Sequence, residues 1–165
     1  MKRIIALLVI MAALLGSLIG CNKKEESRGG KMPEIPDLTV VCGNESITAL
    51  RGEYDWKYEE EQIQEYADLA LNRREETPCL KVSSDNREVS LQFYIEPLEV
   101  FVYCWDTDSW GGEYADYVEI KVDGTTFTLL ETDCVYEIMA RWQGDDEEGG
   151  TLSGIVYYSF YTDMQ

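Results

Sequence analysis

The sequence predicts an all-β protein whose folded part is an antiparallel β-sandwich, with a small β-barrel as the alternative. Two observations lead to this fold class. Short segments rich in β-branched and aromatic residues recur along the chain, separated by turn residues at intervals of roughly 8–12 positions. Helical periodicity is limited to one short stretch. The expected strands are Leu38–Cys42, Ser46–Leu50, Glu53–Glu59, Cys79–Ser83, Glu88–Glu96, Glu99–Trp105, Tyr117–Asp123, Thr125–Leu130, Cys134–Trp142 and Thr151–Thr162.

The first three strands follow from local patterns. Leu38–Cys42 and Ser46–Leu50 are rich in β-branched residues and flank the turn-like Gly-Asn-Glu. In the third strand, Tyr54, Trp56 and Tyr58 alternate with charged residues. This period of two places the three aromatic side chains on one face.

A short surface helix is expected in the segment 59–76. Ile63, Tyr66, Ala67 and Ala70 fall at helical spacing, and glutamates near a helix start favour the positive end of its dipole. An acidic loop between strands is the alternative. Pro78 ends whichever structure precedes it.

The central strands differ in their patterns. Glu88–Glu96 alternates apolar and polar residues, as a strand with one buried face does, and Pro97 ends it. Glu99–Trp105 is apolar on both faces, which is typical of a central strand.

Two hairpins are expected toward the C-terminus. Asp123-Gly124 is a strong signal for a tight turn between Tyr117–Asp123 and Thr125–Leu130. An acidic loop joins Cys134–Trp142 to Thr151–Thr162, so these two long strands are predicted to form a terminal hairpin.

The N-terminus has the features of an export signal. A positive start is followed by the apolar run Ile4–Leu15 and then by small residues, as in a secretory signal peptide. Leu18-Ile19-Gly20-Cys21 resembles the lipobox of bacterial lipoproteins, which implies that Cys21 is lipidated and becomes the first residue of the mature chain. An uncleaved membrane anchor is the alternative. We therefore expect a signal peptide at 1–20, a flexible linker at 21–37 and one domain at 38–165.

Composition limits the classes of partner. The formal net charge is −18, and nucleic-acid binding depends on lysine and arginine, so no nucleic-acid partner is expected. The chain has no histidine, which removes the usual general base and metal ligand near neutral pH. We expect no catalysis and no cofactor. A cationic partner remains open, although an acidic surface also simply favours solubility.

Four cysteines remain once Cys21 carries lipid. Outside the cytoplasm an even number of cysteines is consistent with two disulfides. The predicted pairs are Cys42–Cys79 and Cys104–Cys134, with buried free thiols as the alternative.

Two acidic segments are candidate cation sites. Asp106 and Asp108 precede Gly111 in the manner of a calcium loop, and Glu113 and Asp116 are the further carboxylates within reach. The cluster Asp145–Glu148 lies between glycines. In both cases a solvated loop between strands is the competing interpretation.

Tyrosine is a third candidate for function. Tyr94, Tyr103, Tyr157 and Tyr161 are expected on outward strand faces, where tyrosine provides a large contact area at low entropic cost. Such a surface suits a glycan or an extended peptide. Ordinary β-propensity and sandwich packing explain the same residues without a ligand.

Several short motifs lie along the predicted domain. Their residues are Gly52, Tyr54, Trp56, Phe93, Pro97, Tyr136, Glu137, Ile138, Ala140, Trp142, Tyr158, Ser159 and Phe160. These motifs resemble those of an uncharacterised family of small secreted or lipid-anchored lipoproteins of Firmicutes, especially clostridia. The resemblance implies an immunoglobulin-like sandwich at the cell surface and implies no activity. It lends no support to disulfides, because cysteines are not among its landmarks.

Together these features predict a lipid-anchored lipoprotein on the extracytoplasmic face of a bacterial membrane. It is expected to act as a binding module without catalytic activity. The expected partners are the membrane, through the lipid, and an envelope protein, wall polymer or glycan. A cation-responsive surface module and a carboxylate-based hydrolase are the alternatives.

Overall fold

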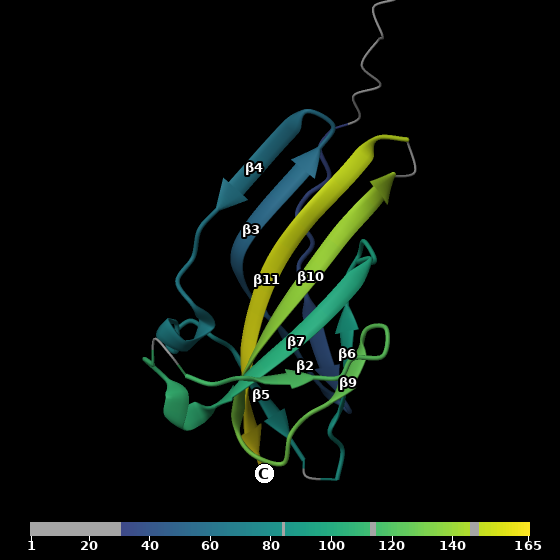
Figure 1. The fold of residues 1–165 in the computed structure, drawn as a ribbon. Coiled ribbons are helices and arrows are strands. Elements are labelled where there is room, and N and C mark those ends of the chain that lie inside the picture. The colour runs from purple at the N-terminus through teal and green to yellow at the C-terminus, as the bar shows by residue number, and fades with distance from the viewer. Residues whose placement is uncertain (1–30, 84, 113–114, 146–148) are drawn as a thin grey trace, which may run out of the picture.

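The computed structural model describes residues 31–83, 85–112, 115–145 and 149–165. The predicted signal peptide and Cys21 lie outside these residues. The described chain forms two β-sheets that pack face to face, and the longer strands run well past the smaller sheet (Figure 1). The predicted β-sandwich is confirmed, and neither sheet closes on itself.

The smaller sheet has the strand order β2-β1-β6-β9, and all of its pairs are antiparallel. Its strands are β1 (Thr39–Cys42), β2 (Glu45–Thr48), β6 (Glu88–Gln92) and β9 (Thr126–Thr128).

The larger sheet has the order β4-β3-β11-β10-β7-β8, and β5 also pairs with β11. Its strands are β3 (Leu50–Tyr58), β4 (Glu61–Glu65), β5 (Cys79–Val82), β7 (Glu99–Asp106), β8 (Val118–Ile120), β10 (Cys134–Asp145) and β11 (Thr151–Met164). The β5–β11 pair is parallel, which is the one described departure from the antiparallel pattern. Two short 3-10 helices, η2 (Ala70–Asn72) and η3 (Thr107–Ser109), lie between strands.

The core lies between the two sheets. Alternation along the strands determines which side chains enter it, as the sequence predicts: Trp56 and Tyr58 of β3 are buried, while Asp55 and Lys57 are exposed. Tyr136 stacks on Phe160 of the neighbouring strand, with ring centroids 5.0 Å apart. The smaller sheet contributes mainly aliphatic side chains to this core.

The prediction of a surface helix within residues 59–76 is wrong. The first part of this segment is β4, which pairs with the free edge of β3, and only three residues form η2. Gln62 and Gln64 donate hydrogen bonds to the two carboxylate oxygens of Asp55 on β3, at 2.7 and 2.8 Å. A short isolated helix is marginal in water, so a ladder of backbone bonds with these side-chain links outweighs weak helical periodicity.

The Asp123-Gly124 turn is confirmed, but its two flanks do not form a long hairpin. Asp123 and Thr126 exchange backbone hydrogen bonds of 2.8 and 3.0 Å, and Gly124 has a φ of +60°. The preceding strand, β8, joins β7 in the larger sheet, while β9 joins β6 in the smaller one. The turn therefore connects the two layers of the sandwich.

Residues 31–37, which we call the strap, do not behave as the flexible linker predicted for them. The strap lies along the sandwich, with Met32 and Ile35 packed against the core and Pro36 buried. Ordered structure thus begins before Leu38, the predicted start of the domain. Within the described residues, no helix has the length and apolar character needed to cross a membrane.

Candidate functional site

An open groove lies at the end of the sandwich where the smaller sheet stops. β6 ends at Gln92, but β10 and β11 continue beyond it, so part of their inner face has no opposing sheet (Figure 1). The strap and the segment 93–98 cover this face incompletely. Between them is a groove of about 910 Å³, within the size range of ligand pockets.

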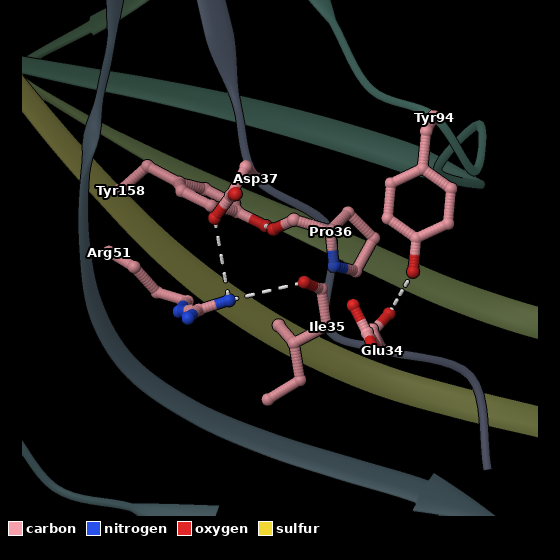
Figure 2. Close-up of polar contacts among 7 residues, drawn as sticks. All are labelled: Glu34, Ile35, Pro36, Asp37, Arg51, Tyr94 and Tyr158. Carbon is pink, nitrogen blue, oxygen red and sulfur yellow. Dashed lines mark hydrogen bonds and ion pairs between the residues drawn. The ribbon is translucent and has the colours of Figure 1, made fainter.

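The strap forms one wall of the groove. Four successive strap carbonyls each accept a hydrogen bond from a side chain of the sandwich, and Figure 2 shows three of these contacts. The donor–acceptor pairs are Trp56 Nε1 with Pro33 (3.0 Å), Tyr94 OH with Glu34, Arg51 Nη1 with Ile35 (3.1 Å) and Tyr158 OH with Pro36 (2.6 Å). Proline has no N–H, so Pro33 and Pro36 interrupt any regular ladder, and side chains bind the strap instead.

The segment 93–98 forms the opposite wall. Trp142 Nε1 donates to the Ile95 carbonyl at 3.0 Å, and the Leu98 N–H donates to the Arg141 carbonyl at 2.8 Å. The sequence predicts that β6 reaches Glu96, but it ends four residues earlier. The chain leaves the sheet at this point, and its departure makes room for the groove.

An aromatic cluster beneath the groove ties the two walls together. Trp142 makes edge-to-face contacts with Trp56 and Phe93, at centroid distances of 5.3 and 5.7 Å, and Phe93 contacts Tyr158 at 5.9 Å. All four residues belong to the motifs compared with the Firmicutes proteins. Their ring bodies pack in the core, while the polar atoms of Trp56, Trp142 and Tyr158 hold the strap or the opposite wall.

The groove combines an apolar floor with a partly polar rim. Trp142 and Leu152 in the floor are 3% and 6% exposed, whereas Tyr94 and Leu98 at the rim are 64% and 57% exposed. Lys31, Glu96 and Asp145 are the charged residues that line it. This arrangement suits an elongated ligand that buries apolar groups and keeps polar groups at its edges.

The four predicted tyrosines do not share one surface. Tyr94 lies at the groove, but Tyr103, Tyr157 and Tyr161 lie on the opposite, outer face of the larger sheet. Tyr103 contacts Tyr117 there at 5.2 Å, and Tyr161 packs edge-to-face on Trp110 at 5.8 Å. The separation arises because Tyr94 continues the outward-facing positions of β6 in the smaller sheet, whereas the other three tyrosines lie on strands of the larger sheet, and the outward faces of the two layers point in opposite directions.

The predicted calcium loop is not assembled within the described residues. The Asp106 carboxylate accepts a hydrogen bond from the Asp108 N–H at 2.9 Å and so caps η3. Asp116 is exposed, and Glu113 lies outside the described residues. No group of three acidic or cysteine side chains that could hold a metal ion occurs in the described ranges. Of the cluster Asp145–Glu148, only Asp145 is described, and it lies at the groove rim.

The four described cysteines are free thiols, and neither predicted disulfide is formed. The Cys42 thiol donates to the Asn86 carbonyl at 3.3 Å and is not bonded to Cys79. Cys104 and Cys134 share a hydrogen bond that, with burial, raises the pKa of Cys104. They occupy diagonal positions of the β7–β10 pair, because Cys104 is opposite Tyr136 and Cys134 is opposite Asp106. Diagonal Cα atoms are about 7–8 Å apart, whereas a disulfide needs less than about 6.8 Å.

Glu137 belongs to the motifs of the family resemblance, but the sequence alone assigns it no role. It lies on the outer face of β10 and accepts a hydrogen bond from the Ala70 N–H, which ties η2 to the sheet. Its pKa is raised, first by burial and then by the nearby Glu53. Glu53, Asp68 and Glu137 line a smaller hollow of about 230 Å³. The segment between β4 and η2 packs beside this carboxylate, so its burial depends on a long-range contact that a local sequence pattern does not predict.

The raised pKa of Glu137 predicts a pH-dependent stability. A carboxyl group whose pKa is raised by folding stabilises the protein below its unfolded value near 4.5, and this contribution is lost as the pH rises through the folded value. The glutamine side chain of the Glu137→Gln variant does not titrate, so the variant should not lose this stability as the pH rises. Melting temperatures of both proteins are measured from pH 4 to pH 7. The melting temperature of the variant should increase relative to that of the wild type as the pH rises. Parallel curves would contradict the assignment.

The comparisons with known proteins add no relative. No protein-family model, no curated protein and no solved structure matches the chain. The functional interpretation therefore depends on the groove and on the chain's own residues.

Proposed function

We propose that the protein is a lipid-anchored, extracytoplasmic binding module without catalytic activity, and that it holds its partner in the end groove. The partner is an envelope protein or glycan that approaches the outer surface of the membrane. The observation that carries this proposal is the groove itself, with its buried apolar floor and the exposed Tyr94 and Leu98 at its rim.

The position of the groove supports a role near the membrane. Its wall is the strap, and the strap continues directly toward the lipobox-like Cys21. Lys31 follows Cys21 by ten positions, so even a fully extended tether places the groove within about 36 Å of a lipid on Cys21. Two or more acyl chains give stable anchoring. The full sequence has a formal net charge of −18, and removal of residues 1–20 with Lys2 and Arg3 leaves −18 − 2 = −20, so an anchor of this kind keeps the mature chain at an anionic surface that would otherwise repel it.

Binding accounts for the described carboxylates better than hydrolysis or cation binding. Glu53 and Glu137 line one hollow, as a hydrolase pair would, but the Glu137 carboxylate already binds the Ala70 amide. Asp106 is likewise engaged as the cap of η3. In the groove, by contrast, the Tyr94 ring and the Leu98 side chain are exposed beside a buried apolar floor, and contiguous apolar surface of this kind often marks an interaction site.

Photo-crosslinking in intact cells tests this proposal. A photoreactive amino acid in place of Leu98, at the groove rim, should give a discrete adduct. The same substitution at Ile63, an exposed aliphatic residue on β4, is the control and should not. Cys21→Ser should release the protein from the membrane fraction and reduce the Leu98 adduct at least about tenfold, because tethering raises the effective concentration.

Two results would overturn the proposal. Equal adducts from Leu98 and Ile63 would show that the groove is not the contact surface. Full membrane retention of the Cys21→Ser protein would exclude the lipid anchor.

A further inference from the structure

The groove contains an exposed strand edge. The β7–β10 pairing ends at Arg141 opposite Glu99, whereas β10 continues to Asp145. β7 and β11 are the strands that pair with β10 in the described chain, so no described strand lies beside Gln143–Asp145 on the β7 side.

The register shows which backbone groups this edge presents. The Arg141 carbonyl points toward the β7 side, because it accepts the bond from the Leu98 N–H. Residues two apart in an antiparallel strand direct their N–H and C=O groups to the same side. Gln143 and Asp145 therefore direct theirs away from β11 and into the groove, while Gly144 faces Leu152 of β11.

Side chains around the edge favour an extended ligand. A strand laid along Gln143–Asp145 would continue the line of β7, and its inward side chains would meet the apolar floor at Trp142 and Leu152. Leu98, at the rim where β7 begins, would contact the end of such a strand. Strand addition of this kind obtains affinity from main-chain bonds and specificity from pockets for alternate side chains.

Charge selects the class of peptide. Glu96 and Asp145 at the rim outnumber Lys31, and the whole chain carries a formal net charge of −18. This field attracts a basic segment and repels an acidic one.

We propose that the groove binds an extended, basic segment of a partner protein, which adds as a strand to the Gln143–Asp145 edge of β10. The inference depends on the groove being the binding site, as proposed above. It goes further because it specifies that the partner is a peptide and that the backbone of Gln143–Asp145 binds it.

One edge strand of the larger sheet, β4, does not offer the same site. All five of its side chains are exposed. It bears Glu61 and Glu65, and charged residues on an edge strand hinder further pairing.

The test compares two substitutions at one residue. Gln143→Pro removes the N–H that points into the groove, whereas Gln143→Ala removes only the side chain. Proline is tolerated at an edge position whose N–H is not used within the sheet. The probe is a nine-residue peptide that alternates lysine with valine or tyrosine, and its affinity is measured by calorimetry and by tryptophan fluorescence. Gln143→Ala should bind like the wild type, and Gln143→Pro at least about tenfold more weakly.

Modified peptides tested on the wild-type protein provide an independent test of strand addition if the Gln143→Pro variant does not fold. N-methylation of the amides on one side of the peptide should weaken binding at least about tenfold, and N-methylation of those on the other side should not, because only one edge pairs. The matched peptide with glutamate in place of lysine should not bind. Raising the salt concentration should weaken the lysine peptide.

The alternatives give distinct results. Equal losses from Gln143→Ala and Gln143→Pro, or indifference to N-methylation, would overturn strand addition but leave the groove as the site. Equal binding of the glutamate peptide would overturn the basic selectivity. A dimer that forms in sedimentation and is abolished by Gln143→Pro would assign the edge to a second copy of the chain. Failure of the Leu98 crosslink would instead count against the proposed function.

Discussion

A chain that begins at Leu38 is expected to be much less stable than one that begins at Lys31. Removing the strap leaves Trp56 Nε1 and the Tyr158 hydroxyl without their acceptors and exposes the core surface that Met32 and Ile35 cover. The lost apolar burial and hydrogen bonds together amount to about 3–5 kcal/mol. For a domain of this size the melting temperature should fall by roughly 10–20 °C.

Thermal and denaturant unfolding of purified 31–165 and 38–165 chains measure this effect. The 22–165 chain is the matched control, and its stability should equal that of 31–165, because the four strap contacts are present in both. If 38–165 melted within about 2 °C of 31–165, the strap would not be part of the folded unit.

The second large effect is expected at Gly154, on β11 beneath the aromatic cluster. A Cβ at this position would lie 2.2 Å from Trp56 Cε3 and 3.2 Å from the Asp55 carbonyl oxygen. The Trp56 ring cannot easily move away, because it is fully buried, contacts Trp142 and is bound to the Pro33 carbonyl. Gly154→Ala should therefore destabilise the protein by about 3 kcal/mol, the upper end of typical overpacking costs.

Gly144→Ala is the matched control in the same hairpin. A Cβ at Gly144 meets no heavy atom within 4 Å, and alanine restricts the unfolded chain more than glycine does. Its stability should be unchanged or slightly higher, as judged by denaturant midpoints at a constant m-value. Displacement of Trp56 in Gly154→Ala should also free the strap, so protease cleavage within residues 31–37 should accelerate in that variant alone. Similar denaturant midpoints for the two variants would contradict the close packing.

The contrast between β3 and the segment after it shows what a pattern can predict. The alternation of Trp56 and Tyr58 with charged residues indicates which face of the strand is buried, because successive side chains point to opposite faces and the apolar ones favour the core. The next segment carries a weak helical pattern, yet its strand structure comes from bonds to Asp55 on β3. Those bonds depend on a partner strand that a local pattern does not describe.

Long-range contacts explain why the candidate site could be predicted only in part. Tyr94 was singled out as a recognition residue and does lie at the groove, but Leu98, Trp142 and Gln143 were not linked to it. The Tyr158–Pro36 hydrogen bond, which holds one wall of the groove, joins residues 122 positions apart. A groove built from such distant segments has no local sequence signature.

The sequence by itself determined the all-β class, the buried face of β3, the terminal hairpin and the tight turn at Gly124. All of these depend on residue type and on spacing over a few positions, which govern local backbone preference and alternation. Only the tertiary structure decided that β8 and β9 belong to different sheets, that the strap is part of the folded unit, and that β10 extends beyond the end of its pairing with β7. These features depend on which segments pack together, and packing between distant segments is decided by the free energy of the whole fold.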